Sequence, residues 1–221
     1  MPYYLAIDIG ASSGRHIIGW QENGMIHTQE VYRFPNGVSS LHGHLVWDIN
    51  ALFQNVKEGI CRAFREYPQI ESLSIDTWGV DYVLMQSAQE ITPCYAYRDT
   101  RTERSIGFGH NTIPFSELYR HTGCQFQTFN TVYQLYVDYR SGRLEGVTDI
   151  LMIPEYLLFK LSGVKVREYT NATTTGLVSA ATGEFDTEII DRLGLPRPLF
   201  PLLTQPGTVL GDLLPEISEE V

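Results

Sequence analysis

The stretch Leu5-Ala6-Ile7-Asp8-Ile9-Gly10-Ala11-Ser12-Ser13-Gly14-Arg15 is an apolar run that ends in one carboxylate and a turn of small residues. Apolar residues resume at His16-Ile17-Ile18, which predicts two strands joined by a tight hairpin. Small residues let backbone N–H groups approach an anion, and the serine hydroxyls add donors. One carboxylate is enough to hold phosphate-bound Mg²⁺, often through water. The stretch indicates a nucleotide site, although a buried strand closing on a glycine hairpin explains it about as well.

The spacing in this stretch matches neither of the two commoner phosphate-binding signatures. The chain has no G-x-x-x-x-G-K-[ST] motif and no G-x-G-x-x-G motif that opens a helix. It also lacks a G-x-S-x-G elbow, so a serine hydrolase is unsupported. The motif content therefore argues against a P-loop enzyme and against a dinucleotide-binding fold.

Composition and charge narrow the class of protein. The 221 residues carry a net charge of −10, from 26 acidic and 16 basic side chains, which disfavours nucleic acid and anionic membranes as partners. The chain does not open with a basic and apolar leader, and it has no run of about 18 apolar residues, so we expect no membrane span. Cys61, Cys94 and Cys124 lie far apart, which indicates free thiols in a cytoplasmic protein rather than a zinc site.

Hydrophobic patterning predicts an antiparallel meander at the start of the chain. Residues 3–9, 15–20 and 25–33 are typical of three consecutive strands. Asn23-Gly24, which joins the last two, is a strong signal for a two-residue hairpin turn. Residues 35–45 are rich in Gly, Ser, Asn and His, and we expect a loop or a short irregular insert there.

A helix and two further strands follow. Asp48 is placed to cap a helix whose apolar residues fall at steps of three and four, and Pro68 stops it. Strands are predicted at residues 73–75 and 82–85. A three-stranded meander, a helix and a strand returning beside the first make a mixed five-stranded α/β sheet rather than a doubly wound one.

The second half of the chain is predicted to be more helical. The pattern indicates helices at residues 115–121, 131–140 and 186–193, the last capped by Asp186. Residues 149–161 form an apolar segment, and residues 207–211 are predicted as a strand or an extended segment.

Four polar segments are candidates for ligand contacts, and each has a purely structural alternative. A Trp face packs well against a sugar, and Asp and Thr bind hydroxyls. The structural alternative is that Trp78 belongs to the core and that Asp76 and Asp81 cap turns. Asp99 and Arg101 could clamp a polyol or form a weak surface pair. Asn130 or Thr131 could cap a helix instead. The segments are Ile75–Asp81, Tyr97–Arg101, Phe126–Thr131 and Glu168–Thr175.

Together these blocks resemble the FGGY carbohydrate kinases, within the actin, Hsp70 and sugar-kinase superfamily. Asp8-x-Gly10-x-Ser12-Ser13-x-Arg15 is similar to the first phosphate motif of the superfamily. The later blocks are more specific and resemble the rhamnulokinase branch over nearly the whole chain. They are Ser74–Asp81, Ala96–Arg101, Phe129–Leu135, Glu168–Thr175 and Gly207–Gly211.

The resemblance implies a ribonuclease-H-like, actin-like ATPase domain with helices on both faces of the sheet. It implies transfer of the γ-phosphate of ATP to a sugar, with L-rhamnulose as the substrate and L-fuculose or L-xylulose as alternatives. Asp8 would hold Mg²⁺, and Gly79 with Trp78 would line the sugar site. The implied ATP-phosphate residues are Ala11, Ser12, Ser13, Gly14 and Arg15, and the further substrate residues are Asp81, Arg98 and Asn130.

One departure from the family pattern is its length. Such kinases are about twice as long, and their catalytic Asp lies in a His-Asp-Thr block that would come after Val221. We therefore expect residues 1–221 to be the N-terminal sugar-binding kinase domain, partnered by its own C-terminal domain in a longer protein. We assign no catalytic residue to this chain and expect little activity from it alone. A non-enzymatic sugar or nucleotide sensor on the same scaffold is the alternative.

Overall fold

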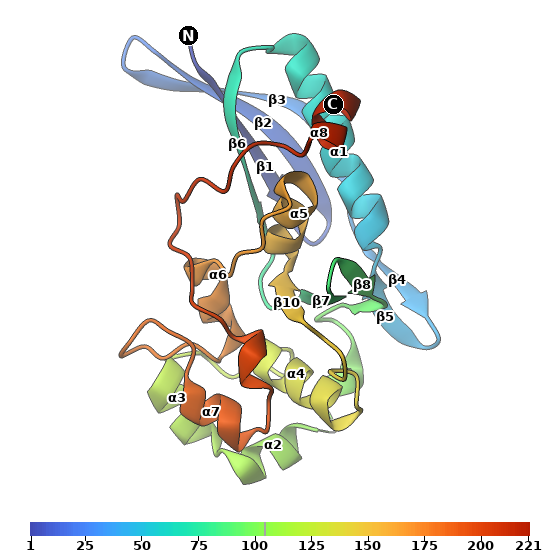
Figure 1. The fold of residues 1–221 in the computed structure, drawn as a ribbon, viewed down its shortest axis with the longest axis vertical. Helices are drawn as coiled ribbons and strands as arrows, with labels where there is room; N and C mark the ends of the chain where they lie inside the picture. Colours follow the sequence, from blue (N-terminus) through green and yellow to red (C-terminus); the bar gives the residue numbers. More distant parts are fainter. Residues whose placement is uncertain (104) are drawn as a thin grey trace.

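Four strands form the sheet that begins the chain (Figure 1). The computed structural model describes residues 1–103 and 105–221, with Phe108 described in its backbone only. The strand order is β3-β2-β1-β6, with β1 antiparallel to β2 and parallel to β6. The predicted meander is confirmed, although its second strand begins two residues earlier than expected. The strands are β1 (Tyr3–Ile9), β2 (Ser13–Glu22), β3 (Met25–Pro35) and β6 (Ile70–Thr77).

One face of this sheet packs into a hydrophobic core, and the other face is open. Leu5, Ile7 and Ile9 of β1 are buried, whereas Tyr4 and Ala6, which point to the opposite side, are exposed. The buried face packs against α1 (Ile49–Glu66) and α5 (Ile153–Ser162). The α/β class is confirmed, but both of these helices cover the same face, and no helix of the described residues covers the open one.

Helix α1 forms where the sequence predicts it. The Asp48 carboxylate accepts the Ala51 N–H at 2.9 Å, which satisfies one of the free donors of the first turn. Val56, Ile60 and Ala63 form its apolar stripe and are fully buried against the sheet. The capped, amphipathic pattern is therefore sufficient to place this helix.

The fifth predicted strand belongs to a different sheet. Strand β7 (Tyr82–Gln86) pairs with β10 (Asp149–Met152) and β8 (Gln89–Ile91), and not with β6. The chain turns away from the first sheet at Val80, whose φ of 69° is in the left-handed region. The prediction of a single five-stranded sheet was wrong because the run at 82–85 is buried in this second sheet, where most of its residues are apolar.

The segment predicted as a loop at residues 35–45 contains most of a hairpin. Strands β4 (Val38–Leu41) and β5 (His44–Trp47) pair through a turn at His42 and Gly43, both with positive φ. Strand β9 (Cys94–Tyr95) adds to β5. The loop prediction failed because β4 is mostly exposed and polar, which hides the alternation that marks a half-buried strand.

The second half of the chain surrounds a second core, centred on α4 (Thr131–Arg140) and lying below the first sheet in Figure 1. The predicted helices are confirmed, and the Asp186 carboxylate caps α7 (Thr187–Arg192). The apolar segment at 149–161 divides into β10 and α5, and residues 207–211 form no strand. The other helical elements are α2 (Ile106–Thr112), α3 (Phe115–Thr122), α6 (Tyr169–Ala172), α8 (Pro215–Glu220), η1 (Thr100–Thr102), η2 (Thr173–Thr175) and η3 (Arg197–Leu199).

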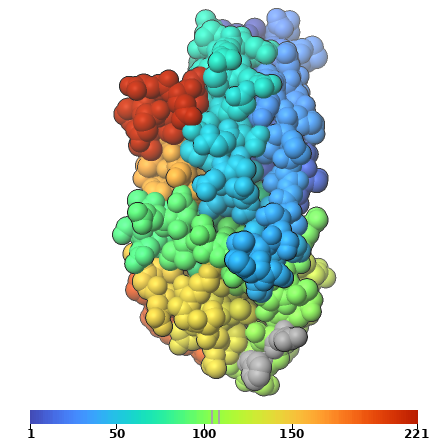
Figure 2. Space-filling model, turned by 90° about the vertical axis from the view of Figure 1, so that its right-hand side faces the viewer, coloured from blue at the N-terminus to red at the C-terminus, as the bar shows by residue number. Residues whose placement is uncertain are grey.

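The C-terminal helix returns to the first core. Figure 2 shows α8 against α1, at the end of the molecule opposite the second core. The Lys57 ammonium of α1 lies 2.5 Å from the Glu220 carboxylate of α8. Among the described residues, no helix is both long and apolar enough to cross a bilayer.

Candidate functional site

The predicted phosphate turn follows β1 on the open side of the sheet. Residues Gly10–Ser13 connect β1 to β2, and the Gly10 N–H donates to the Ser13 carbonyl at 2.9 Å. Asp8 and Arg15 face each other in the β1–β2 register. The Arg15 Nε donates to Asp8 Oδ2 at 2.7 Å, and Nη2 lies 2.6 Å from the same oxygen. The hairpin therefore presents a carboxylate and a guanidinium directly below a turn of small residues.

These two residues belong to a row of four charges across the open face. Strand pairing places Asp76 beside Asp8, Asp8 beside Arg15, and Arg15 beside Arg33. Burial and the neighbouring Asp8 charge raise the pKa of Asp76. Arg33 donates to the Glu30 carboxylate at 2.9 Å from its Nε. The open face thus changes from negative at β6 to positive at β3.

The second predicted motif lies at the same edge of the sheet as the phosphate turn. Because β1 and β6 are parallel, their carboxyl ends meet at one edge, where ligands of α/β proteins bind. Gly79, just beyond β6, lines a cavity of about 910 Å³ together with Asp76 and Thr77. A Cβ atom at Gly79 would lie 3.0 Å from Thr174 Oγ1, so a larger residue would require the Thr174 side chain to shift slightly. The structure therefore puts the hairpin and the glycine at one edge of the sheet, and of the two only the glycine lines the cavity.

Asp81 lies in the protein interior and not in the cavity. It is fully buried, and four N–H groups donate to its carboxylate, at distances of 2.6–3.1 Å. Burial raises the pKa of Asp81 even though these hydrogen bonds favour the charged form. These contacts give Asp81 a structural role behind the sugar site, and its direct contact with the sugar stays a prediction. The donors are the Trp47 and Trp78 indoles, the Tyr97 backbone and the Gln134 amide.

Trp78 and Arg98 remain accessible on either side of this buried carboxylate. Trp78 is half-buried, and its ring centroid lies 4.2 Å from that of Trp47. Arg98 is exposed, and its Nε donates to the Tyr97 hydroxyl at 3.1 Å. Tyr97 in turn packs edge-on against Phe129. Asp81 thus fixes both the Trp78 indole and the backbone of Tyr97.

Asn130 is held inside the protein by its own contacts. Only 6% of its surface is exposed, and its Nδ2 donates to the Gln125 carbonyl at 2.9 Å and to Cys124 Sγ at 3.3 Å. Its side chain makes no capping hydrogen bond to α4. Its donors are thus used to hold the 124–130 loop, and its contact with the sugar stays a prediction.

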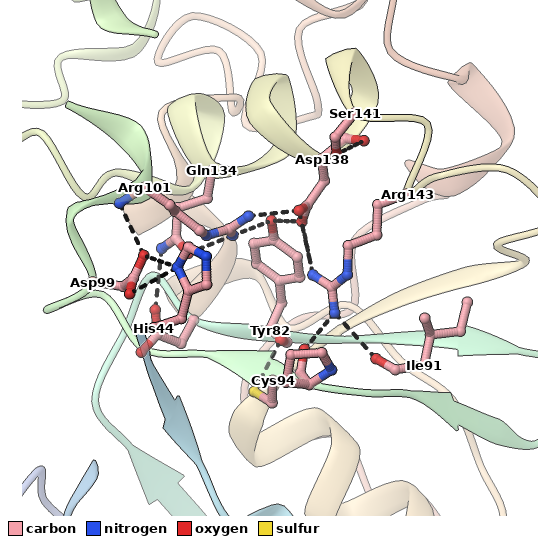
Figure 3. Close-up of polar contacts among 12 residues, drawn as sticks. His44, Tyr82, Ile91, Cys94, Asp99, Arg101, Gln134, Asp138, Ser141 and Arg143 are labelled. Atoms are coloured by element: carbon pink, nitrogen blue, oxygen red, sulfur yellow. Dashed lines mark hydrogen bonds and ion pairs between the residues drawn. The ribbon is translucent and has the colours of Figure 1, made fainter. Parts of the chain in front are cut away.

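A buried polar network supports the site from behind and was missed by the sequence analysis (Figure 3). Arg101 Nη1 lies 2.5 Å from Asp138 Oδ1, and the Tyr82 hydroxyl donates to Asp138 Oδ2 at 2.5 Å. Arg101 Nη2 also donates to Gln134 Oε1 at 3.1 Å, and the Gln134 amide reaches Asp81. The Arg101–Asp138 ion pair and the hydrogen bonds of Tyr82 and Gln134 therefore join η1, β7 and α4 to the carboxylate that holds Trp78.

One feature of the sequence could have located this network. Thr131, Gln134 and Asp138 recur at steps of three and four, and so form a polar line on an otherwise apolar helix.

Asp99 does not pair with the Arg101 side chain, contrary to the predicted clamp or surface pair. It is buried and accepts the Leu45 N–H at 2.7 Å, beside His44. Asp99 and Arg101 are thus held by contacts within the protein, and Arg98 is the exposed charge of this segment.

A group of potential metal ligands lies elsewhere, among α3 and α7. Single ligand atoms of Glu117, His121 and Glu188 lie within 4.8 Å of one another. Glu117 already accepts two hydrogen bonds from Arg192, and His121 is 2.8 Å from the Asp186 carboxylate. These ligands are therefore paired with protein groups, and we do not assign a metal to them.

Comparison with protein families identifies the chain. The model of the N-terminal domain of the FGGY family of carbohydrate kinases matches residues 3–221. The chain belongs to this FGGY family. A rhamnulokinase of Oceanobacillus iheyensis is 44% identical over 98% of this chain and 47% of its own length, and one of Enterococcus faecalis is 42% identical over 95% and 43%. This FGGY chain therefore spans about half the length of the curated relatives it matches.

Solved structures of FGGY kinases share the fold. A ligand-bound xylulose kinase from Lactobacillus acidophilus superposes with a TM-score of 0.86 at 20% identity, over 100% of this chain and 45% of that protein. A Plasmodium falciparum glycerol kinase with ADP gives a TM-score of 0.81 at 15% identity, over 100% and 46%. At these identities the match establishes the fold of the FGGY domain and not its ligands.

Proposed function

We propose that this chain is the phosphate- and sugar-binding half of a kinase that transfers the γ-phosphate of ATP to L-rhamnulose, forming L-rhamnulose 1-phosphate. The observation that carries the proposal is the parallel pairing of β1 with β6. It puts the Gly10–Ser13 turn and Gly79 at one edge of the sheet, where a phosphate donor and its acceptor have to meet. The identity of about 40% to rhamnulokinases along the whole chain supports the choice of sugar.

The residues at the hairpin fit a magnesium-bound triphosphate. Asp8 uses only Oδ2 for Arg15, so Oδ1 has no hydrogen-bond partner among the described residues. A carboxylate oxygen in this position suits Mg²⁺ or one of its waters. Bound there, Mg²⁺ would neutralise phosphate charge. The Ala11–Arg15 segment would supply N–H, hydroxyl and guanidinium donors to the phosphate oxygens.

The sugar would occupy the side of the edge where Gly79 opens into the cavity. Trp78 offers an apolar surface to a sugar ring, and the exposed Arg98 guanidinium offers hydrogen bonds to its hydroxyls. Asp81 and Asn130 would act behind this surface. The catalytic base and the remaining nucleotide contacts would come from a C-terminal domain in a longer protein, so this half positions the reactants and neutralises charge.

Binding to the isolated chain tests the proposal. Backbone amide NMR spectra would be followed while MgATP, L-rhamnulose, L-fuculose and L-xylulose are each added. We expect MgATP to shift the amides of residues 10–15 and L-rhamnulose to shift those of residues 78–80, more tightly than the other two ketoses. Equal or tighter binding of L-fuculose or L-xylulose would overturn the assigned sugar, and absence of MgATP shifts would overturn the phosphate site.

A further inference from the structure

Asn36, at the end of the neighbouring strand β3, holds the phosphate turn in place by hydrogen bonds. It is the first residue after β3, and it contacts the turn through both its backbone and its side chain. Its N–H donates to the Ser12 carbonyl at 3.0 Å, and its Nδ2 donates to the Gly10 carbonyl at 2.8 Å. Its own Oδ1 accepts the Gly37 N–H at 3.0 Å, which orients the amide group. One residue therefore binds both ends of the exposed turn.

These contacts decide which way the peptide groups of the turn point. The carbonyls of Gly10, Ser12 and Ser13 each accept a hydrogen bond from within the protein. In the part of the chain that the structure describes, neither the Ala11 N–H nor the Ser12 N–H donates to a protein acceptor. With three of its four carbonyls bound to protein donors and two N–H groups free, the turn has the features that suit an anion.

The same end of β3 also packs beneath the turn. A Cβ atom at Gly14 would lie 2.1 Å from the Phe34 ring, so Phe34 fills the space under the first residues of β2. Phe34 is buried, while Asn36 lies at the rim with partial exposure. The Phe34 ring therefore supports the turn from below, and Asn36 supports it from the side. Of these two residues, only Asn36 binds carbonyl groups of the turn.

We infer that Asn36 is a positioning residue for the nucleotide phosphates, in that its amide holds the Gly10 carbonyl away from the bound anion. Without this donor, the Gly10 carbonyl would be free to rotate toward the ligand, where its partial negative charge repels phosphate oxygens. This inference rests on the proposed function and adds to it a residue that does not itself touch the ligand. Positioning of this kind requires only an Asn side chain at the end of β3 and the β1–β2 hairpin that this side chain contacts.

The test compares two single Asn→Asp substitutions that change the charge equally. Asn36→Asp keeps the backbone hydrogen bond to Ser12 but replaces the Nδ2 donor with an oxygen facing the Gly10 carbonyl. Asn23→Asp makes the same change at the exposed hairpin tip at the other end of β2 and β3. Both variants of the 221-residue chain would be titrated with MgATP and with L-rhamnulose, following the amide resonances of Ala11, Ser12 and Gly79.

We expect Asn36→Asp to weaken MgATP binding at least about tenfold, because the N–H groups of the turn would no longer be oriented for charge-assisted hydrogen bonds to phosphate. The Ala11 and Ser12 amides should also shift before any nucleotide is added. L-rhamnulose binding and the thermal midpoint should stay close to those of Asn23→Asp. Equal MgATP affinity in the two variants would overturn the role of Asn36 alone. A wild-type chain that shows no MgATP shifts would overturn the proposed function, and this inference with it.

Discussion

Arg15 donates from both Nε and Nη2 to a single oxygen of Asp8, at 2.7 and 2.6 Å, and so leaves the other carboxylate oxygen without a hydrogen-bond partner among the described residues. The guanidinium has five donors, and this contact uses two of them. The pair is nearly half-exposed, which makes it a weak source of stability. Its arrangement suits a role in binding, because a donor and an acceptor are both left available at the turn.

Arg15→Ala should weaken MgATP binding by roughly 10- to 100-fold, the effect expected for losing hydrogen bonds to a charged group. The free energy of unfolding should change by less than about 1 kcal/mol, because the ion pair is exposed. Arg62→Ala is the matched control, since Arg62 pairs with Glu58 on α1 in a similarly exposed setting. Isothermal titration and urea unfolding would measure both quantities, and equal MgATP affinity in the two variants would remove Arg15 from the phosphate site.

Gly59→Ala should destabilise the chain even though alanine is the better helix former. A Cβ atom at this position of α1 would lie 2.2 Å from the buried His16 ring of β2. Overpacking of this kind costs about 1–3 kcal/mol, more than the roughly 1 kcal/mol that alanine adds to a helix. Gly37→Ala, where no atom lies within 4 Å of the added carbon, is the control. A Gly59→Ala chain as stable as the wild type would contradict this close contact between helix and sheet.

Glu155 should make stability depend on pH. Burial raises its pKa to about 7, although its carboxylate accepts the Met152 and Glu168 N–H groups. The folded chain then binds more protons than the unfolded chain between pH 4.5 and 7. The contribution of Glu155 is therefore fully present below pH 4.5 and is lost as the pH rises to 7, by about 3 kcal/mol in all.

The comparison with Glu155→Gln isolates this effect. His16 acts in the opposite direction, because burial lowers its pKa to about 4 and its contribution is lost as the pH falls from 6.5. The pH dependence of the wild-type stability alone contains the contributions of both Glu155 and His16. Urea unfolding at pH 4.5, 6 and 7.5 should show the wild type losing stability relative to Glu155→Gln as the pH rises, and a constant difference would show that Glu155 titrates normally.

Asp81→Asn should disturb the Trp78 surface that we propose for the sugar, without removing a direct contact to the sugar. The amide would turn an N–H₂ group toward at least one of the four donors now satisfied by the carboxylate, which costs about 1–3 kcal/mol. We expect lower stability, altered Trp47 and Trp78 fluorescence and weaker L-rhamnulose binding, with MgATP binding retained. Unchanged fluorescence together with lost sugar binding would instead indicate direct contact between Asp81 and the sugar.

Local patterns in the sequence were sufficient to predict the elements that depend on residues close together in the chain. The Asp48 and Asp186 caps, the apolar stripe of α1 and the Asn23-Gly24 turn were all predictable, since each rests on spacing within a few residues. The pairing of Asp8 with Arg15 also follows from a tight hairpin, which fixes the register of the strands it joins.

The parts that could not be predicted depend on residues far apart in the chain. Asp81 was expected at a ligand because nothing near it in sequence shows that Trp47 and Gln134 would meet it in the interior. Strand β7 was assigned to the first sheet because its partner β10 lies more than 60 residues away. Asn36 fell in a segment read as a loop, and its role became visible only when β3 was placed beside the phosphate turn.

The row of charges on the open face also constrains how the strands can pair. Asp76, Asp8, Arg15 and Arg33 occupy matching positions on four strands, and in β1 each neighbour of Asp8 is buried. Shifting any one strand by a single residue would turn its charge into the apolar core and its core residues to water. Misaligned hairpins are thereby strongly disfavoured, so the side chains suited to phosphate binding also help the chain to find its correct register.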